Sequence, residues 1–321
     1  MLRFICTLLF IFITFQTQGW GFYGHQKINE HAVYLLPPQM MVFFKPHIRY
    51  LSVHAPDADK RRYIIADEGP RHYIDLDLFG NYPYAHLPRR WEDAVAQFSE
   101  DTLLSRGIVP WHVMRTYKLL INAFEEKNAT KILKLAADLG HYISDAHVPL
   151  HTSHNHNGQF TNQHGIHGFW ESRVPELLAE GEFDFFIGKA EYLKYPEDYI
   201  WNRILESNLA CDSVLLFEKN LSEQMRKDTK YAFEERNGKV IRQYSAVFTR
   251  NYHEQLNKMV ERRMRMAIFS TASFWFTAWV NAGQPDLSIL IKDGIETNHE
   301  ELEKINNAWQ SGKAMLGRQE D

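Results

Sequence analysis

The sequence predicts an all-α fold, a single multi-helix domain, and three observations support this. Apolar residues recur at intervals of three and four along several long stretches, which is the spacing of one face of a helix. Runs of alternating apolar and polar residues, which would indicate strands, are few. The chain has 321 residues and contains neither an internal repeat nor a low-complexity linker. One domain is therefore the simplest interpretation.

The first two predicted helices are separated by a glycine. The first covers residues 91–106, and its apolar side chains are those of Ala94, Val95, Phe98 and Leu103. Gly107 ends this helix, because glycine favours the position just after a last helical turn. Pro110 then opens a second helix, which continues to Phe124, since proline is tolerated in a first turn.

A third helix is predicted after Asn128, whose side chain can cap the helix start. Its apolar face consists of Ile132, Leu135, Ala136, Leu139 and Ile143, and Pro149 stops it. Later helices are predicted over residues 201–221 and 245–282, the last ended by Gly283 and Pro285. The final stretch, residues 291–321, is polar and charged, which fits a peripheral helix or a loose tail.

The first nineteen residues have the order of a secretory signal peptide. Arg3 supplies a positive charge, residues 4–15 form an apolar run, and small or polar residues follow up to Gly19. Spanning a bilayer takes about 20 apolar residues, so the run is short for an anchor, although an uncleaved anchor is the alternative. We expect cleavage before Trp20, a secreted or periplasmic protein, and a main domain over residues 20–290.

Cysteine content and charge narrow the chemistry further. The expected mature chain keeps only Cys211, which excludes an intramolecular disulfide. The formal net charge is −4, and −5 once Arg3 leaves with the signal, so the overall balance lacks the basic footprint of tight, non-specific nucleic-acid binding. After the signal, no stretch is apolar enough to cross a membrane; residues 268–282 come closest but contain several polar residues.

The segment from residue 138 to 172 carries most of the functional information, because it holds seven of the sixteen histidines. His141 and Asp145 are four residues apart on a predicted helix, and His167 and Glu171 form a second such pair, with His151 between them. A single pair of this kind is usually a surface hydrogen bond. Two pairs and an intervening histidine are instead what a catalytic zinc site requires, since imidazoles supply neutral nitrogen and carboxylates offset the charge.

Other histidines and two further segments are less informative on their own. His147, His154, His156 and His164 fit loop residues or residues that support metal ligands. The further segments are Trp20–His25 (WGFYGH) and residues 57–75, which contain the run DADKRR and the run RHYID. An aspartate beside a basic run is usually part of a solvated loop.

Taken together, these segments resemble the superfamily of bacterial zinc phospholipases C and the fungal and plant single-strand-specific nucleases. Members of that superfamily are α-helical enzymes that hold three zinc ions in a cleft. The resemblance extends from Trp20 to about Pro175, and more faintly through the final apolar helix, and nine positions appear in the same order. It implies a trinuclear zinc cleft in this chain.

The resemblance also implies which residues bind each ion. The first zinc matches Asp59, His72, His141 and Asp145. The second matches His151, His167 and Glu171. The third matches Trp20, through its free amine and carbonyl, together with His25 and a bridging Asp145. Asp57 remains an alternative to Asp59, which is preferred because Arg62 follows three residues later.

Asp59 and Arg62 are the two residues assigned to catalysis. In the nucleases an arginine at the position of Arg62 lies near the scissile phosphate. Water between two zinc ions loses a proton near neutral pH and attacks phosphorus, while the ions and Arg62 stabilise charge on the phosphoryl oxygens.

The resemblance divides over the substrate. The five-residue step from Trp20 to His25 and the position of Arg62 are like the nucleases, whereas Glu171 and the short gap from His151 to His167 are like the phospholipases. Because the net charge is acidic, we favour a phospholipase-C-like phosphodiesterase, with a nuclease that cleaves DNA or RNA as the alternative. A zinc-binding protein without turnover is an alternative of another class. The sequence implies no protein partner.

Overall fold

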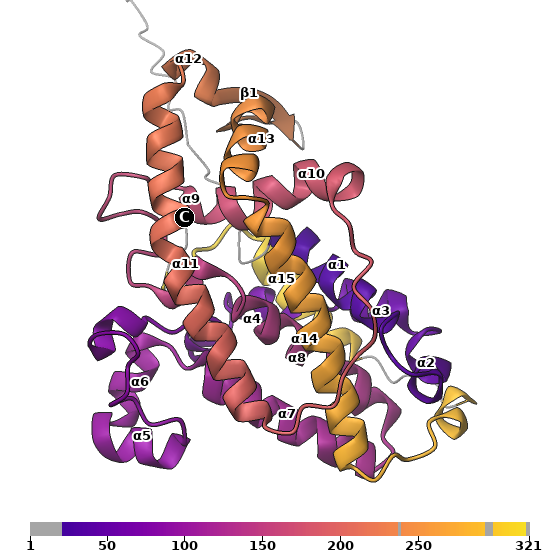
Figure 1. Cartoon of the computed structure of the whole chain (residues 1–321). Coiled ribbons are helices and arrows are strands. Elements are labelled where there is room, and N and C mark those ends of the chain that lie inside the picture. The colour runs from indigo at the N-terminus through magenta and orange to yellow at the C-terminus, as the bar shows by residue number, and fades with distance from the viewer. Residues whose placement is uncertain (1–20, 237–238, 293–297, 319–321) are drawn as a thin grey trace, which may run out of the picture.

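The computed structural model describes residues 21–236, 239–292 and 298–318, and this part of the chain is mostly helical (Figure 1). The predicted all-α class is therefore confirmed. The predicted signal peptide and Trp20 lie outside the described residues. Within the described residues, no helix combines the length and the apolar character needed to cross a membrane.

Most elements follow one another closely along the chain, and the longer connections are residues 80–90, 153–165 and 183–195. The first part contains α1 (Gly21–Val33), α2 (Pro38–Phe44), α3 (Ile48–Val53), α4 (Asp57–Arg61), η1 (Ala66–His72), η2 (Leu76–Phe79), α5 (Trp91–Phe98) and α6 (Glu100–Arg106). The middle contains α7 (Val109–Glu125), α8 (Ala129–Asp145), η3 (Pro149–Thr152), α9 (Ile166–Gly168), η4 (Phe169–Arg173), α10 (Val174–Glu182) and α11 (Pro196–Gln224). The last part contains α12 (Lys227–Lys230), β1 (Tyr231–Arg236), β2 (Lys239–Tyr244), α13 (Ala246–Gln255), α14 (Met259–Asn281), η5 (Ser288–Lys292) and α15 (His299–Gln310).

Helices α1, α7, α8 and α14 pack around the hydrophobic core, whose members come from Ile28 in α1 to Leu290 in η5. Trp275 of α14 is fully buried there, and its indole nitrogen donates a hydrogen bond of 3.0 Å to the carbonyl of Ala136 in α8. The long helix α11 lies at the left in Figure 1 and packs against η3 and α7. This arrangement surrounds α8 with other helices, so residues at its end are removed from solvent.

A close approach between α1 and α8 aligns two parts of the candidate site. A Cβ atom on Gly140 would lie 2.0 Å from Oδ1 of Asn29, so only glycine permits this contact. The amide of Asn29 donates hydrogen bonds to the carbonyls of Ala137 in α8 and Leu51 in α3. One buried asparagine thus joins three helices. Asn29 lies four residues after His25, and its partner Ala137 lies four residues before His141.

Two predicted helices are each divided in the structure. The helix expected over residues 91–106 is interrupted at Ser99, which has φ of 68° and whose hydroxyl accepts a hydrogen bond from the backbone of Thr102. The helix expected over residues 245–282 breaks at Asn257 and Lys258, both in the left-handed region. Apolar spacing continues across each break, which is why periodicity alone does not reveal it.

A short antiparallel hairpin is the only sheet among the described residues. Strands β1 and β2 pair from Tyr231 opposite Tyr244 to Arg236 opposite Lys239. The prediction had found few strand-like runs and had not anticipated this hairpin.

Candidate metal centre

The eight predicted metal ligands that the structure describes come together from seven elements, and all are buried. They are His25 of α1, Asp59 of α4, His72 of η1, His141 and Asp145 of α8, His151 of η3, His167 of α9 and Glu171 of η4. The ninth, Trp20, lies outside the described residues. Three groups of these side chains have ligand atoms within metal-binding distance of one another.

In the first group, Asp59 and two histidines meet the carboxylate of Asp145. His72 Nδ1 lies 3.0 Å from Asp145 Oδ2, and His141 Nε2 lies 3.2 Å from the same oxygen. Asp59 Oδ1 is 3.6 Å from each of these nitrogens. Neither oxygen of Asp59 accepts a hydrogen bond from the described residues, although the side chain is fully buried. Such a carboxylate is costly to bury unless a cation compensates its charge.

The second group contains His151, His167 and Glu171. Glu171 Oε2 lies 3.3 Å from His151 Nε2 and 3.0 Å from His167 Nε2. The two histidine nitrogens are 3.1 Å apart. Residues 169–173 form a π-helical turn, a local widening that is frequent at functional sites.

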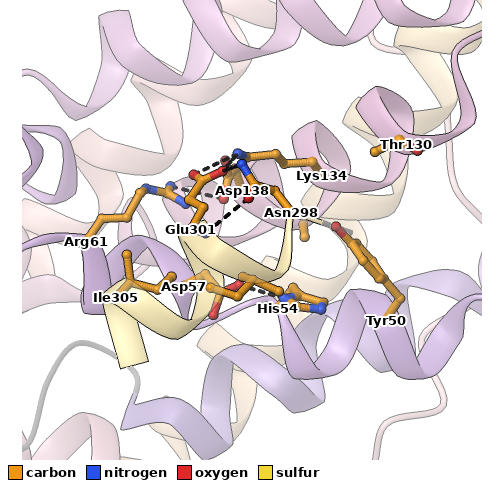
Figure 2. Close-up of a pocket in the computed structure, with 12 residues that line it drawn as sticks. Tyr50, His54, Asp57, Arg61, Thr130, Lys134, Asp138, Asn298, Glu301 and Ile305 are labelled. Carbon is orange, nitrogen blue, oxygen red and sulfur yellow. Dashed lines mark hydrogen bonds and ion pairs between the residues drawn. The ribbon is translucent and has the colours of Figure 1, made fainter. Parts of the chain in front are cut away.

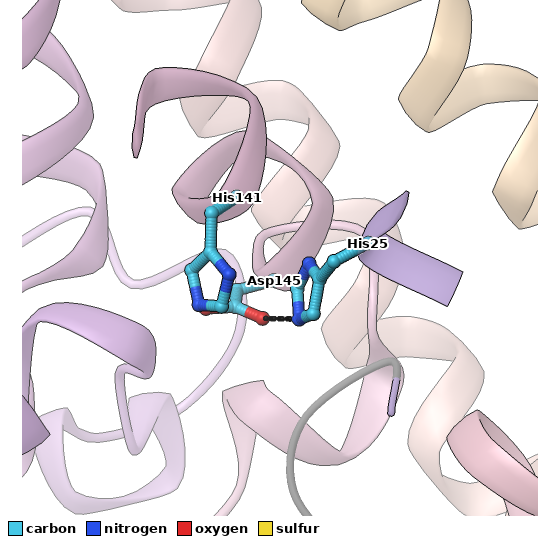
Figure 3. Close-up of side chains that lie close together, drawn as sticks. All are labelled: His25, His141 and Asp145. Carbon is cyan, nitrogen blue, oxygen red and sulfur yellow. Dashed lines mark ion pairs between the residues drawn. The ribbon is translucent and has the colours of Figure 1, made fainter. Parts of the chain in front are cut away.

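A third group connects α1 to α8 (Figure 3). The rings of His25 and His141 are stacked with their centroids 3.8 Å apart. His25 Nε2 lies 3.5 Å from Asp145 Oδ1 and 3.8 Å from Asp59 Oδ2. Asp145 therefore faces two groups, as expected of a bridging carboxylate.

In four histidines, the ring nitrogen Nδ1, which faces away from the cluster, makes a hydrogen bond. This hydrogen bond fixes the orientation of the ring and therefore the direction in which Nε2 points. The Nδ1 atoms of His141, His151 and His167 donate to the carbonyls of Ala55, His72 and His156, respectively. Nδ1 of His25 contacts the hydroxyl of Ser144 at 2.7 Å; because that hydroxyl donates to the carbonyl of His141, the histidine is the donor here. In each case a ring in its neutral form directs the lone pair of Nε2 into the cluster.

This pattern leaves nitrogen lone pairs facing each other. With both rings neutral and their proton on Nδ1, the Nε2 lone pairs of His151 and His167 meet at 3.1 Å beside a glutamate oxygen. Three electron-rich atoms at such distances repel one another unless a proton or a metal cation lies between them. Two ligands of a tetrahedral zinc are about 3.3 Å apart when metal–ligand bonds are 2.0–2.1 Å. The observed separations of 3.0–3.3 Å fit that spacing.

The environment also shifts the acidities of these groups. Burial raises the pKa of the Asp59 carboxyl to about 6, and the nearby charge of Asp145 acts in the same direction. Burial opposes the charge of Asp145 as well, but His141 and His151 hold its pKa well below the usual range. Burial disfavours protonation of His72, yet its hydrogen bonds to Asp145 and Glu68 raise its pKa to about 9. Both raised pKa values mean that the buried groups hold protons in place of a cation, and a bound cation would lower them.

Glu68 is a buried member of the site that the sequence analysis missed. Its Oε1 lies 3.7 Å from Nε2 of His72, on the side of the ring opposite to the cluster. The hydroxyl of Tyr142 donates to Glu68, and the guanidinium groups of Arg61 and Arg71 lie beside it. Glu68 and His72 are four residues apart in the sequence, and this spacing could have predicted that their side chains meet. A carboxylate behind a ligating histidine orients the ring and increases its basicity.

Asp57, the alternative to Asp59, lies in a different environment. Its carboxylate contacts Nδ1 of His54 at 2.6 Å and the ammonium of Lys60 at 2.8 Å. It lines a polar pocket of about 220 Å³ between α15 and the helices α3, α4 and α8, shown in Figure 2. It belongs to none of the three ligand groups, whereas Asp59 does.

The remaining histidines of residues 138–172 belong to none of the three ligand groups either. His147 turns toward α14, where its Nε2 contacts the hydroxyl of Ser270 at 3.0 Å. His154 lies 3.4 Å from Asp75, and His156 offers its carbonyl to His167. His164 is exposed.

Arg62 is fully buried directly after α4, and its charge partly offsets the net rise in the pKa values of Asp59 and His72. Its Nη2 donates a hydrogen bond of 2.9 Å to the carbonyl of Arg318. Arg62 therefore lies near the first ligand group, as predicted from the sequence. Its guanidinium is hydrogen-bonded to the backbone of Arg318.

Comparisons with known proteins returned no family model that matches this chain and no curated protein that matches its sequence. The geometry described above is therefore the basis on which a function is assigned.

Proposed function

We propose that this protein is a zinc-dependent phosphodiester hydrolase of the phospholipase C type, exported and trimmed so that Trp20 becomes its N-terminus. The proposal depends most on one observation. The Nε2 atoms of His151 and His167 converge on the carboxylate of Glu171, while the Nδ1 atoms of both rings donate hydrogen bonds to backbone carbonyls. Neutral nitrogen and carboxylate oxygen, without a cysteine ligand, form the donor set of catalytic zinc sites. The orphaned carboxylate of Asp59 supports a second ion in the first group.

Three zinc ions are proposed, held by the three ligand groups, with Trp20 completing the third. Bound zinc supplies Lewis acidity and activates water for attack on a phosphodiester. The chain contributes fixed orientation: backbone carbonyls hold the histidine rings, and Asp145 faces two groups. Arg62 provides a permanent positive charge for a phosphoryl oxygen, and such preorganised donors stabilise the charge that develops in the transition state.

A phospholipid is the favoured substrate, and single-stranded nucleic acid is the second candidate. Glu171 as the third ligand of its group and the sixteen-residue spacing from His151 to His167 favour the phospholipase type. The arginine after Asp59 favours the nuclease type. The acidic net charge of −4 supports the lipid over a polyanion.

The test combines metal analysis with turnover. Chain beginning at Trp20 is loaded with zinc, its metal content is measured, and hydrolysis of bis(p-nitrophenyl) phosphate is followed. We expect about three zinc ions per chain and chelator-sensitive turnover. Bound zinc without hydrolysis of any phosphodiester would instead establish a zinc-binding protein. Phosphatidylcholine, single-stranded DNA and RNA, assayed at equal zinc, then separate the two substrate candidates.

A further inference from the structure

The C-terminal arm, defined as residues 299–318, packs onto the elements that carry the metal centre. Its helix α15 lies against α4, with Ile305 buried and the ring of Trp309 5.0 Å from that of Phe22 in α1. An ion pair of 2.9 Å joins Glu301 to Lys134 of α8, as Figure 2 shows. The helix is thus anchored to the same helices that supply His25, Asp59 and His141.

Beyond α15 the arm reaches Arg62 itself. After an exposed stretch from Ser311 to Ala314, Met315 is buried again, and the backbone nitrogen of Leu316 donates to the carbonyl of Arg62 at 3.0 Å. The carbonyl of Arg318 accepts a 2.9 Å hydrogen bond from Nη2 of Arg62. A main-chain oxygen of the arm therefore occupies a donor that the proposed mechanism assigns to a phosphoryl oxygen.

The side chain of Arg318 contacts residues that are adjacent in sequence to His72 and His151, two of the proposed ligands. Its guanidinium pairs with the buried carboxylate of Asp75 at 2.5 Å and lies 3.9 Å from the ring centre of Tyr73. Its Nη2 is 3.4 Å from the carbonyl of Leu150. Tyr73 follows His72 directly and Leu150 precedes His151. Only 9 % of the Arg318 side chain is exposed, so this is an ordered contact at the edge of the centre.

We propose that residues 315–318 form an intramolecular cover that competes with substrate for Arg62. The inference rests on the proposed function, because it assigns Arg62 to the phosphoryl group. Gly312, with φ of 69°, follows α15 and is exposed together with its neighbours. Residues 315–318 can therefore separate from Arg62 while α15 keeps its own contacts. Substrate or an anion gains access to Arg62 as the Arg318 carbonyl leaves, so the arm lowers affinity and turnover until it is displaced.

The test compares two truncations of the zinc-loaded protein. Deleting residues 318–321 removes the Arg318 carbonyl and guanidinium but keeps Met315 and Leu316, whereas deleting 319–321 keeps Arg318 and serves as the matched control. Both shortened chains end in a C-terminal amide, so that no new carboxylate is placed beside Arg62. Inorganic phosphate binding is measured by calorimetry, and kcat/KM is measured on bis(p-nitrophenyl) phosphate. We expect the longer deletion to strengthen phosphate binding and raise kcat/KM by about tenfold, the size of one charge-assisted hydrogen bond. Because the control keeps Arg318, the difference between the two shortened chains isolates the contribution of Arg318.

Combining the longer deletion with Arg62→Ala should abolish the gain, because the gain depends on Arg62. Arg318→Ala in the full chain, which keeps the carbonyl but removes its anchor, should produce a smaller gain of the same sign. Unchanged or weaker phosphate binding after the longer deletion, with zinc content retained, would overturn the proposal. If no variant turns over any phosphodiester, the hydrolase assignment fails, while the phosphate titration still decides whether the arm covers Arg62.

Discussion

Two polar clusters contain an aspartate of α4, Asp57 in one and Asp59 in the other, and they differ in how their charges are compensated. In the pocket beneath α15, Asp57 contacts His54 and Lys60, and Glu301 pairs with Lys134. In the metal centre, the oxygens of Asp59 accept no hydrogen bond from the described residues. Burial opposes the charge of Asp57, but His54 and Lys60 lower its pKa; burial raises that of Asp59 to about 6. Two aspartates two residues apart thus differ because only Asp57 contacts its cationic partners within hydrogen-bond distance.

We expect this difference to distinguish a cation site from a salt-bridge cluster. Closeness of acidic and basic side chains is common to both regions. Of the two, the candidate metal centre combines histidine Nδ1 atoms held by carbonyl groups, converging Nε2 atoms, and a buried carboxylate that accepts no hydrogen bond from the described residues. Substitutions that act on one region and not on the other test whether the distinction holds.

The largest effect is expected from His167→Ala. Loss of its Nε2 removes one of three donors from the second group, so we expect about one zinc ion fewer per chain and a fall in turnover of at least about 10²-fold. His141→Ala should act likewise on the first group. His253→Ala is the control, because that ring is stacked on Phe183 and belongs to none of the ligand groups. Full metal content and rate in His167→Ala would show that the second ion is misplaced.

Arg62→Ala should separate catalysis from metal binding. A donor that acts mainly on the transition state affects kcat, and removing one has lowered kcat by about 10²–10³-fold in a studied enzyme. Zinc content should stay unchanged, because Arg62 carries no ligand atom. Steady-state kinetics and metal analysis on one preparation decide the matter. A wild-type kcat would remove Arg62 from the mechanism, and joint loss of zinc and kcat would mean that Asp59 has been disturbed.

Glu68→Gln should have an intermediate effect, on zinc affinity. The amide keeps the size of the side chain but removes the charge behind His72, and loss of such a supporting group typically lowers metal affinity by about 10–100-fold. The readout is competition for zinc with a chromophoric chelator, which requires no turnover. Asp138, which also pairs with Arg61, offers a control in Asp138→Asn, for which zinc affinity should be retained. Equal zinc affinity in the Glu68 and Asp138 variants would reduce Glu68 to a structural role.

The smallest effect on zinc binding is expected from Asp57→Asn, which lies outside the ligand groups. Losing the contacts with His54 and Lys60 should lower the free energy of unfolding by about 1–3 kcal/mol. Zinc content should remain that of the wild type, whereas Asp59→Asn should lose zinc. Thermal unfolding and metal analysis of the pair are sufficient. Loss of zinc from the Asp57 variant would erase the contrast between the two clusters.

Sequence patterns anticipated the parts of this molecule that depend on local spacing. The helical class, the helix capped by Asn128 and the pairs of ligands four residues apart were all predictable in this way. The breaks at Ser99 and Lys258 were not, because each depends on single residues with positive φ while apolar spacing continues. The role of Glu68 and the burial of Arg62 arise from contacts between distant segments; the hydrogen bond from Arg62 to Arg318 spans 256 residues.

The most direct test of the central claim is anomalous diffraction at the zinc absorption edge from crystals of the chain that begins at Trp20. We predict three peaks: one among His151, His167 and Glu171, one among Asp59, His72 and His141, and one beside His25 and Asp145. The third should weaken when residues remain ahead of Trp20, since only a free terminal amine completes that group. A well-ordered structure grown with zinc that shows no peak among His151, His167 and Glu171 would contradict the account.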